Sequence, residues 1–262
     1  MIDQQWTYKT IDQKVVNSLS EEFSIPTLIA KVMALRGITD RQKSRSFFFS
    51  SREAMHSPFL MKDMEKSIIH VHEQILKGDS IVVFGDYDVD GTSGTSLLYL
   101  FLKSVGAEVH YYIPDRENEG YGLSKQGIDY ANYIKSKLLI TCDCAINAFS
   151  QIEYANSLGL NIIITDHHKP AEKLPAAFAI LNPNRFDCNY PFKGLCGAGV
   201  AFKFALGYCE KFSLDPELAW IHSDLAAIAT AADLVPIINE NRTIVQDGLK
   251  RISMGAKPGI KA

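Results

Sequence analysis

The feature that most constrains the fold is a change of hydrophobic period at about residue 80. From there, short apolar segments alternate with longer amphipathic segments, the order expected of parallel strands joined by helices. Five compact segments rich in Val, Ile, Leu or aromatic residues are predicted as strands: 81–84, 108–113, 138–141, 161–165 and 178–181. We therefore expect an α/β fold with a mostly parallel β-sheet flanked by helices.

The segments before and after this region have helical periodicity. Apolar residues recur at helical spacing in IPTLIAKVMALRGI and again from Met61 to Leu76, and Gly37 and Gly78 stand where helices would stop. We predict an N-terminal helical region over 1–77, an α/β domain over 78–240, and over 241–262 the start of a helical linker that stops early.

Composition narrows the class of protein. No apolar run approaches the roughly 18 residues of a membrane span, and the N-terminus lacks the order of a signal peptide. We expect a cytoplasmic protein without membrane contact. The net charge of −3 carries no basic signature of nucleic-acid binding, although bound cations would offset an acidic site.

The five cysteines lack CxxC spacing, which predicts reduced thiols. Cys142 and Cys144 are expected on the strand face opposite Asp143.

Acidic and imidazole side chains follow three of the predicted strands. Ligands of open α/β sheets bind beyond the carboxyl ends of the strands, so these positions are where a site is expected. A single acid there is often a helix cap, and Asp86 alone is as readily a cap or a supporting residue as a ligand. Capping does not require two adjacent histidines beside five acids. The set comprises Asp86, Asp88, Asp90, Asp143, Asp166, His167 and His168.

The chemistry of this set predicts metal binding. The spacing Asp86-Tyr-Asp88-Val-Asp90 directs alternate side chains the same way, so the carboxylates repel one another unless a cation lies among them. Carboxylates with imidazoles suit Mn²⁺ or Mg²⁺ better than a metal that prefers thiolates, and this many ligands can hold two ions. Two such ions stabilise the attacking and leaving oxygens of a phosphoryl displacement.

Later segments add weaker signals. Asp233 lies in an Ala-rich helix that is predicted to be buried, and a buried acid needs a partner such as this centre, whereas Asp224 and Asp247 are predicted to be solvated. The Gly-rich segment 91–95 opens a helix but lacks the lysine of a P-loop. The turn over 194–199 is interpreted as an anion-binding turn or as tight packing, with equal weight.

The motifs GDYDVDGTSGT, TCDCAI, TDHHKP, LCGAGVAFKFA and AADLVPI together resemble the DHH phosphoesterase superfamily, and within it the bacterial RecJ single-strand exonucleases. The resemblance extends along nearly the whole chain. It implies a metal-dependent phosphodiesterase with two Mn²⁺ or Mg²⁺ ions, a 5′ to 3′ exonuclease of DNA repair and recombination. The implied partners are single-stranded DNA and, further, single-strand-binding protein or other repair proteins.

The resemblance also implies roles for individual residues. Asp88 and Asp143 would hold one ion, and Asp90, Asp143, His167 and Asp233 the second. His168 would face the scissile phosphate while Asp166 orients the histidine pair, so that these two and Asp143 are the predicted catalytic residues. The predicted substrate contacts are Arg116, His168, Gly197 and Gly199, and Asp86 and Asp166 are predicted to support the ligands from behind.

Two departures from the family pattern keep other functions open. Phe84 stands where relatives often place a histidine of the first metal site, and the second lobe and strand-gripping domain of RecJ proteins are absent from the 262 residues. One alternative is a small-nucleotide or oligoribonucleotide phosphodiesterase of the same superfamily, which the net charge favours. The other is a non-catalytic module that holds metal without hydrolysing a substrate.

Overall fold

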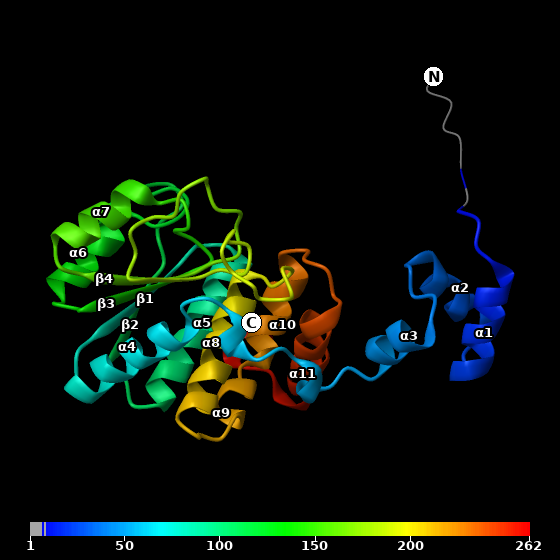
Figure 1. The fold of residues 1–262 in the computed structure, drawn as a ribbon. Coiled ribbons are helices and arrows are strands. Elements are labelled where there is room, and N and C mark those ends of the chain that lie inside the picture. The colour runs from blue at the N-terminus through cyan, green and yellow to red at the C-terminus, as the bar shows by residue number, and fades with distance from the viewer. Residues whose placement is uncertain (1–6, 8) are drawn as a thin grey trace. The chain divides into compact units, whose positions relative to one another are not determined.

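The computed structural model describes residue 7 and residues 9–262, which form two compact units, Met1–Arg52 and Glu53–Ala262. The first unit contains α1 (Gln13–Phe23), α2 (Thr27–Leu35) and α3 (Arg41–Phe48) (Figure 1). The side chains of Asp12 and Asp40 accept hydrogen bonds from the first turns of α1 and α3, which fixes where these helices begin. Its small core contains Val16, Leu19, Ala30, Met33 and Ala34.

The second unit is built on one parallel sheet of five strands in the order β2-β1-β3-β4-β5. Each strand lies at one of the five predicted segments, and the α/β fold is confirmed. β1 and β3 are buried along their whole length, which explains why they are continuous apolar runs. The strands are β1 (Ile81–Gly85), β2 (Val109–Tyr112), β3 (Leu138–Cys142), β4 (Asn161–Thr165) and β5 (Ala179–Leu181).

Helices cover both faces of this sheet (Figure 1). One face packs against α4 (Met64–Lys77), α5 (Val89–Ser104) and α8 (Gly197–Lys211). The other packs against α6 (Lys125–Tyr133) and α7 (Phe149–Ser157). The remaining elements of the second unit are η2 (Pro58–Leu60), α9 (Glu217–Trp220), α10 (Ser223–Ala232), α11 (Asn239–Gly255) and α12 (Pro258–Lys261), and η1 (Arg52–Ala54) lies at the division.

The division between the units differs from the predicted boundary at residue 77. It falls after Arg52, and α4 contributes Met64, Ile68 and Val71 to the core of the sheet. Helical periodicity identifies an apolar stripe but does not say which core the stripe packs against, so the sequence alone does not assign α4 to one unit.

The cysteines are buried and free of disulfides in the described part of the chain. Cys142 packs on the α5 and α8 face of the sheet, whereas Cys144 packs on the α6 and α7 face. The expectation of a shared face is wrong because Asp143 between them has a φ of 61°, which ends the alternation of the strand.

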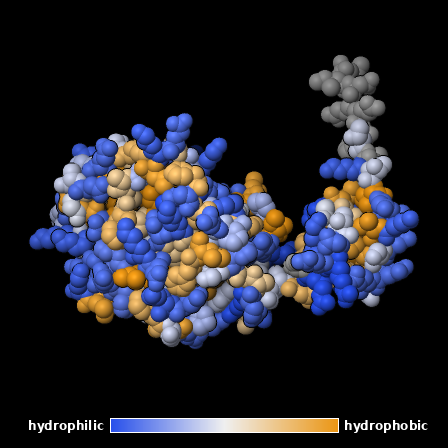
Figure 2. All heavy atoms as spheres, viewed as in Figure 1, coloured by the Kyte–Doolittle hydropathy of each residue, from blue (hydrophilic) through white to orange (hydrophobic). Residues whose placement is uncertain are grey.

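The surface and the helices can be compared with the expectation that the protein does not contact a membrane. Hydrophilic side chains cover much of the visible face of the second unit, with apolar patches between them (Figure 2). None of the helices described is both long and apolar enough to cross a lipid bilayer.

Candidate metal centre

The register of the sheet brings the predicted residues together. Gly85 at the end of β1 pairs with Cys142, and Cys142 pairs with Thr165 at the end of β4. The residues that follow these three strands therefore start level with one another at the carboxyl edge.

His167 lies at the centre of the resulting cluster. Its Nε2 atom is 3.2 Å from Asp143 Oδ1 and 3.7 Å from one carboxylate oxygen each of Asp90 and Asp233. Two groups of three side chains have their potential ligand atoms within 4.8 Å of one another. These groups are Asp143, His167 and His168, and Asp90, His167 and Asp233.

Asp143 reaches this position through an unusual backbone conformation. Its φ of 61° turns the chain sharply after β3, in a region that Asp tolerates better than most residues. Strain of this kind is typical of functional sites. The side chain is buried, and desolvation together with the negative charge of Asp90 raises the pKa of Asp143 to about 10.

The cluster fits a divalent cation. Asp143 Oδ1 and His167 Nε2 are buried and have no hydrogen-bond partner among the described residues. Unpartnered buried polar atoms are rare and call for an explanation such as a bound ion. Carboxylate oxygens with an imidazole nitrogen are ligands that suit Mn²⁺ and accept Mg²⁺, so the donor set and the two orphaned atoms agree.

Asp90 is held by the N-terminus of α8. Its two carboxylate oxygens accept hydrogen bonds from the backbone N–H of Gly197 (2.6 Å) and of Ala198 (2.8 Å). A Cβ atom on Gly197 would lie 2.5 Å from the Cβ of Asp143, so only glycine fits there. The N–H of Gly199 donates to Cys196 Sγ. The turn thus binds a carboxylate of this chain, and its contact with a substrate stays a prediction.

The two earlier acids have different surroundings. Asp88 is exposed and caps α5, its Oδ1 atom accepting a hydrogen bond from the Gly91 N–H at 2.8 Å. It belongs to neither group of three described above. Asp86 is fully buried, accepts a hydrogen bond from the Tyr87 N–H, and has its pKa raised by burial. Their roles as ligand and supporting residue stay predictions.

Asp166 fixes the conformation of the histidine pair. One of its oxygens accepts hydrogen bonds from the backbone N–H groups of His167 (2.7 Å) and His168 (3.0 Å) and lies 2.8 Å from His168 Nδ1. The other oxygen accepts from the Ile146 N–H. The hydrogen bond with Asp166 raises the pKa of His168, although burial opposes it. His168 Nε2 is left facing the Tyr121 hydroxyl at 3.2 Å.

Phe84 points away from the cluster. It is buried, stacks on Tyr112 with ring centroids 5.6 Å apart, and lies against Gly127 of α6. A side chain in that position fills the core on the α6 and α7 face and supplies no ligand atom.

Four residues near the cluster were missed by the sequence analysis. The side-chain amides of Asn182 and Asn184 donate to the backbone carbonyls of His168 and His167. Tyr121 contacts His168 and meets Tyr87 edge to face, with ring centroids 6.1 Å apart. The sequence signals that could have identified them are the Asn-Pro-Asn segment after the fifth strand and the tyrosine of the segment EGYGLS, residues 119–124.

The predicted substrate contact Arg116 lies over the Tyr87 ring, 5.4 Å from its centroid.

Two expectations about acids near α10 need correction. Asp224 is buried rather than solvated, because Lys257, 33 residues later, pairs with it at 2.6 Å. Asp233 follows the last residue of α10 and its side chain is 28% exposed, so it lies at the rim of the cluster rather than inside a buried helix.

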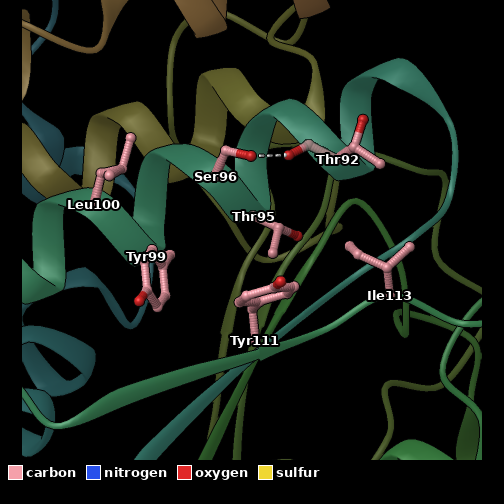
Figure 3. A pocket seen from close by; sticks show the side chains of 7 residues that line it. All are labelled: Thr92, Thr95, Ser96, Tyr99, Leu100, Tyr111 and Ile113. Carbon is pink, nitrogen blue, oxygen red and sulfur yellow. Dashed lines mark hydrogen bonds between the residues drawn. The ribbon is translucent and has the colours of Figure 1, made fainter. Parts of the chain in front are cut away.

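A cavity of about 400 Å³ lies between α5 and the edge strand β2 (Figure 3). Tyr99 and Tyr111 meet edge to face in it, with ring centroids 5.6 Å apart. Thr92 also lines it, and its hydroxyl donates to the backbone carbonyl of Asp88 at the start of α5. The other lining residues are Thr95, Ser96, Leu100 and Ile113.

The parallel sheet and the carboxylate–histidine cluster at its carboxyl edge define an α/β protein with a divalent-metal centre. Residues 80–232 match the DHH family, N-terminal domain, and the chain belongs to this family.

Curated relatives share most of this chain. It is 39% identical over 257 residues to the single-stranded-DNA-specific exonuclease RecJ of Bacillus subtilis, covering 98% of this chain and 32% of that protein. It is 37% identical to the RecJ of Escherichia coli, covering 91% of this chain and 42% of that protein. The chain thus spans less than half the length of these relatives.

Solved structures agree with the fold. A crystal structure of exonuclease RecJ bound to manganese superimposes with a TM-score of 0.68 at 34% identity, covering 74% of this chain and 49% of that one. RecJ of Thermus thermophilus in complex with Mn²⁺ superimposes with a TM-score of 0.76 at 26% identity, covering 94% of this chain and 34% of that one.

Proposed function

We propose that this chain is the metal-holding catalytic lobe of a RecJ-type enzyme that hydrolyses single-stranded DNA from its 5′ end in repair and recombination. The observation that carries the proposal is the pair of buried, unpartnered atoms, Asp143 Oδ1 and His167 Nε2, among the described residues of the cluster. Similarity to RecJ proteins along nearly the whole chain supports the substrate class. Because that substrate is DNA, a cytoplasmic location and contact with single-strand-binding or other repair proteins belong to the proposal.

The proposed ligands form two sets that share Asp143. Asp88 and Asp143 would hold one ion, while His168 stays bonded to Asp166 through Nδ1 and holds no ion. Asp90, Asp143, His167 and Asp233 would hold the other. When bound, two Mn²⁺ or Mg²⁺ ions would lower the pKa of water and neutralise the charge that develops on the phosphoryl oxygens.

The chain's own residues bind and orient the substrate around these ions. Asp166 accepts a hydrogen bond from His168 Nδ1 and raises the pKa of the ring, which favours the imidazolium form. In that form Nε2, on the side of the Tyr121 hydroxyl, can donate a hydrogen bond to a phosphoryl oxygen. The guanidinium carbon of Arg116 lies over the Tyr87 ring, 5.4 Å from its centroid, and its N–H groups would bind a phosphate.

The test is Mn²⁺-dependent hydrolysis of a 5′-labelled single-stranded oligonucleotide and of a dinucleotide. We expect the wild type to shorten the long strand, and Asp143→Asn to reduce the rate on the order of 10³-fold or more, since it removes the shared ligand. The matched control is Asp129→Asn, an exposed residue of α6 that should keep wild-type activity. Cleavage of the dinucleotide alone would identify a small-nucleotide phosphodiesterase. Bound Mn²⁺ without hydrolysis of either would identify a non-catalytic metal-holding module.

A further inference from the structure

The segment that carries Asp233 has little packing of its own. Leu234, the next residue, has a left-handed φ of 57° and is 89% exposed, and Ile238 at the far end is 56% exposed. Between them, Val235 packs partly against the start of α8. One partly buried side chain is a weak restraint on a backbone that must hold a carboxylate in place.

Asn241, in the first turn of α11, supplies further restraints. Its side chain is fully buried, and its Nδ2 atom donates to the carbonyl oxygen of Gly194 at 2.6 Å and to that of Pro236 at 3.0 Å. Carbonyl oxygens can only accept, so the amide nitrogen and not the amide oxygen must face them. Both amide hydrogens of Asn241 are therefore used.

Each of the two carbonyl groups that Asn241 binds lies three residues from a residue that contacts or belongs to the cluster. Gly194 lies three residues before Gly197, whose N–H donates to Asp90. Pro236 lies three residues after Asp233. The side chain of Asn241 thus joins the loop that fixes Asp90 to the loop that carries Asp233.

Asn241 is itself firmly anchored through the preceding residue. Glu240 is buried, pairs with Lys203 of α8 at 2.8 Å, and accepts hydrogen bonds from the His56 N–H and the Tyr190 hydroxyl. The start of α11 is therefore fixed to α8, the helix whose N-terminus holds Asp90. The position of the Asn241 amide follows from that attachment.

We propose that Asn241 is a positioning residue of the metal centre, which sets the separation of Asp90 and Asp233 so that both reach one cation beside His167. The inference rests on the proposed function, since it concerns the same ions. It predicts that loss of the amide hydrogens weakens the site of Asp90 and Asp233 more than the site of Asp88, because the two amide bonds of Asn241 go to the loops of Asp90 and Asp233.

The test is calorimetric titration of the whole chain with Mn²⁺, for the wild type, Asn241→Asp and Asn241→Ala. Asn241→Asp keeps the shape of the side chain but replaces its donors by an oxygen that faces two carbonyl oxygens. We expect about 10- to 100-fold weaker binding at one of two sites, the range seen when supporting partners of metal ligands are lost. The matched control is Ile152→Val, a buried residue of α7 on the other face of the sheet, which should lower the unfolding temperature but not the Mn²⁺ affinity.

The outcomes separate this inference from the proposed function. Wild-type protein that binds no Mn²⁺ would overturn both. Wild-type binding that is unchanged in the folded Asn241 variants would overturn only the role of Asn241. If Asn241→Asp does not fold, Asn241→Ala decides, since it removes the bonds without adding charge. Its unfolding temperature should then rise less on adding Mn²⁺ than that of the wild type, and an equal rise would contradict the proposal.

Discussion

The second unit buries charged side chains around Lys203 and around Asp143, and these two groups are balanced in different ways. Lys203 and Glu240 are both nearly inaccessible, and each is satisfied by the other and by neighbouring polar groups. Around Asp143 the buried groups are mostly acids, and in the part of the chain that is described neither Asp143 Oδ1 nor His167 Nε2 has a hydrogen-bond partner. The first group is complete as folded, whereas the second requires a cation from solution.

The directions of the pKa shifts express the same contrast. Burial lowers the pKa of Lys203, and the adjacent Glu240 opposes this, so the pair holds its two charges together. Burial and Asp90 both act to raise the pKa of Asp143, and neither favours its charged form. A buried acid with like charges around it is a source of instability unless a metal ion binds.

The largest change in the free energy of unfolding should follow from breaking the buried pair of Lys203 and Glu240. Lys203→Met keeps the length of the apolar stem but leaves the Glu240 carboxylate buried without its cation. We expect a loss of about 3–5 kcal/mol in the free energy of unfolding, measured by urea denaturation. The double variant Lys203→Met, Glu240→Gln should recover much of that loss. If the single variant loses less than about 1 kcal/mol, Lys203 is not needed to stabilise the buried charge of Glu240. The two groups of buried charges then do not differ in this way.

A smaller effect of opposite sign is expected at the metal cluster. Because the pKa of Asp143 is raised to about 10, folding without metal at pH 8 requires this acid to take up a proton that the unfolded chain does not hold, and Asp143→Asn removes that cost. In EDTA the variant should therefore be more stable than the wild type, by about 1–3 kcal/mol. With Mn²⁺ at about 1,000 times the dissociation constant the order should reverse, because binding then stabilises the wild type by about 4.1 kcal/mol. Thermal unfolding at pH 8 with and without Mn²⁺ measures both. A variant less stable than the wild type in EDTA would show that Asp143 is already compensated without metal.

Local patterns in the sequence were sufficient for the sheet and for bringing most of the cluster together. Apolar runs identified the five strands, and the rule that sites lie beyond strand ends located Asp90, Asp143 and His167. These inferences succeed because a parallel sheet buried on both faces leaves a continuous hydrophobic signal, and because its strands end at a common edge.

The contacts between loops could not be read from the sequence. Asn241 binds the carbonyl of a residue 47 positions earlier, and Asp224 pairs with a lysine 33 positions later. Neither partner is marked by spacing or by residue type. The face of Cys144 was also missed, because one left-handed residue at Asp143 ends the strand period without any glycine to announce it. Such features depend on tertiary structure.

The smallest effect should come from a second lysine on the helix that carries Lys203. Lys211 pairs with Glu65 of α4 at 2.5 Å, but the two side chains are 35% and 60% exposed. Because water and salt screen an exposed pair, we expect Lys211→Met to change the free energy of unfolding by less than about 0.5 kcal/mol in the same urea experiment. The two variants share the helix, the residue types and the substitution, so burial is the main difference between them. If both variants lose the same free energy of unfolding, the substitution of a lysine in α8 explains the loss at Lys203, and the buried charge of Glu240 does not.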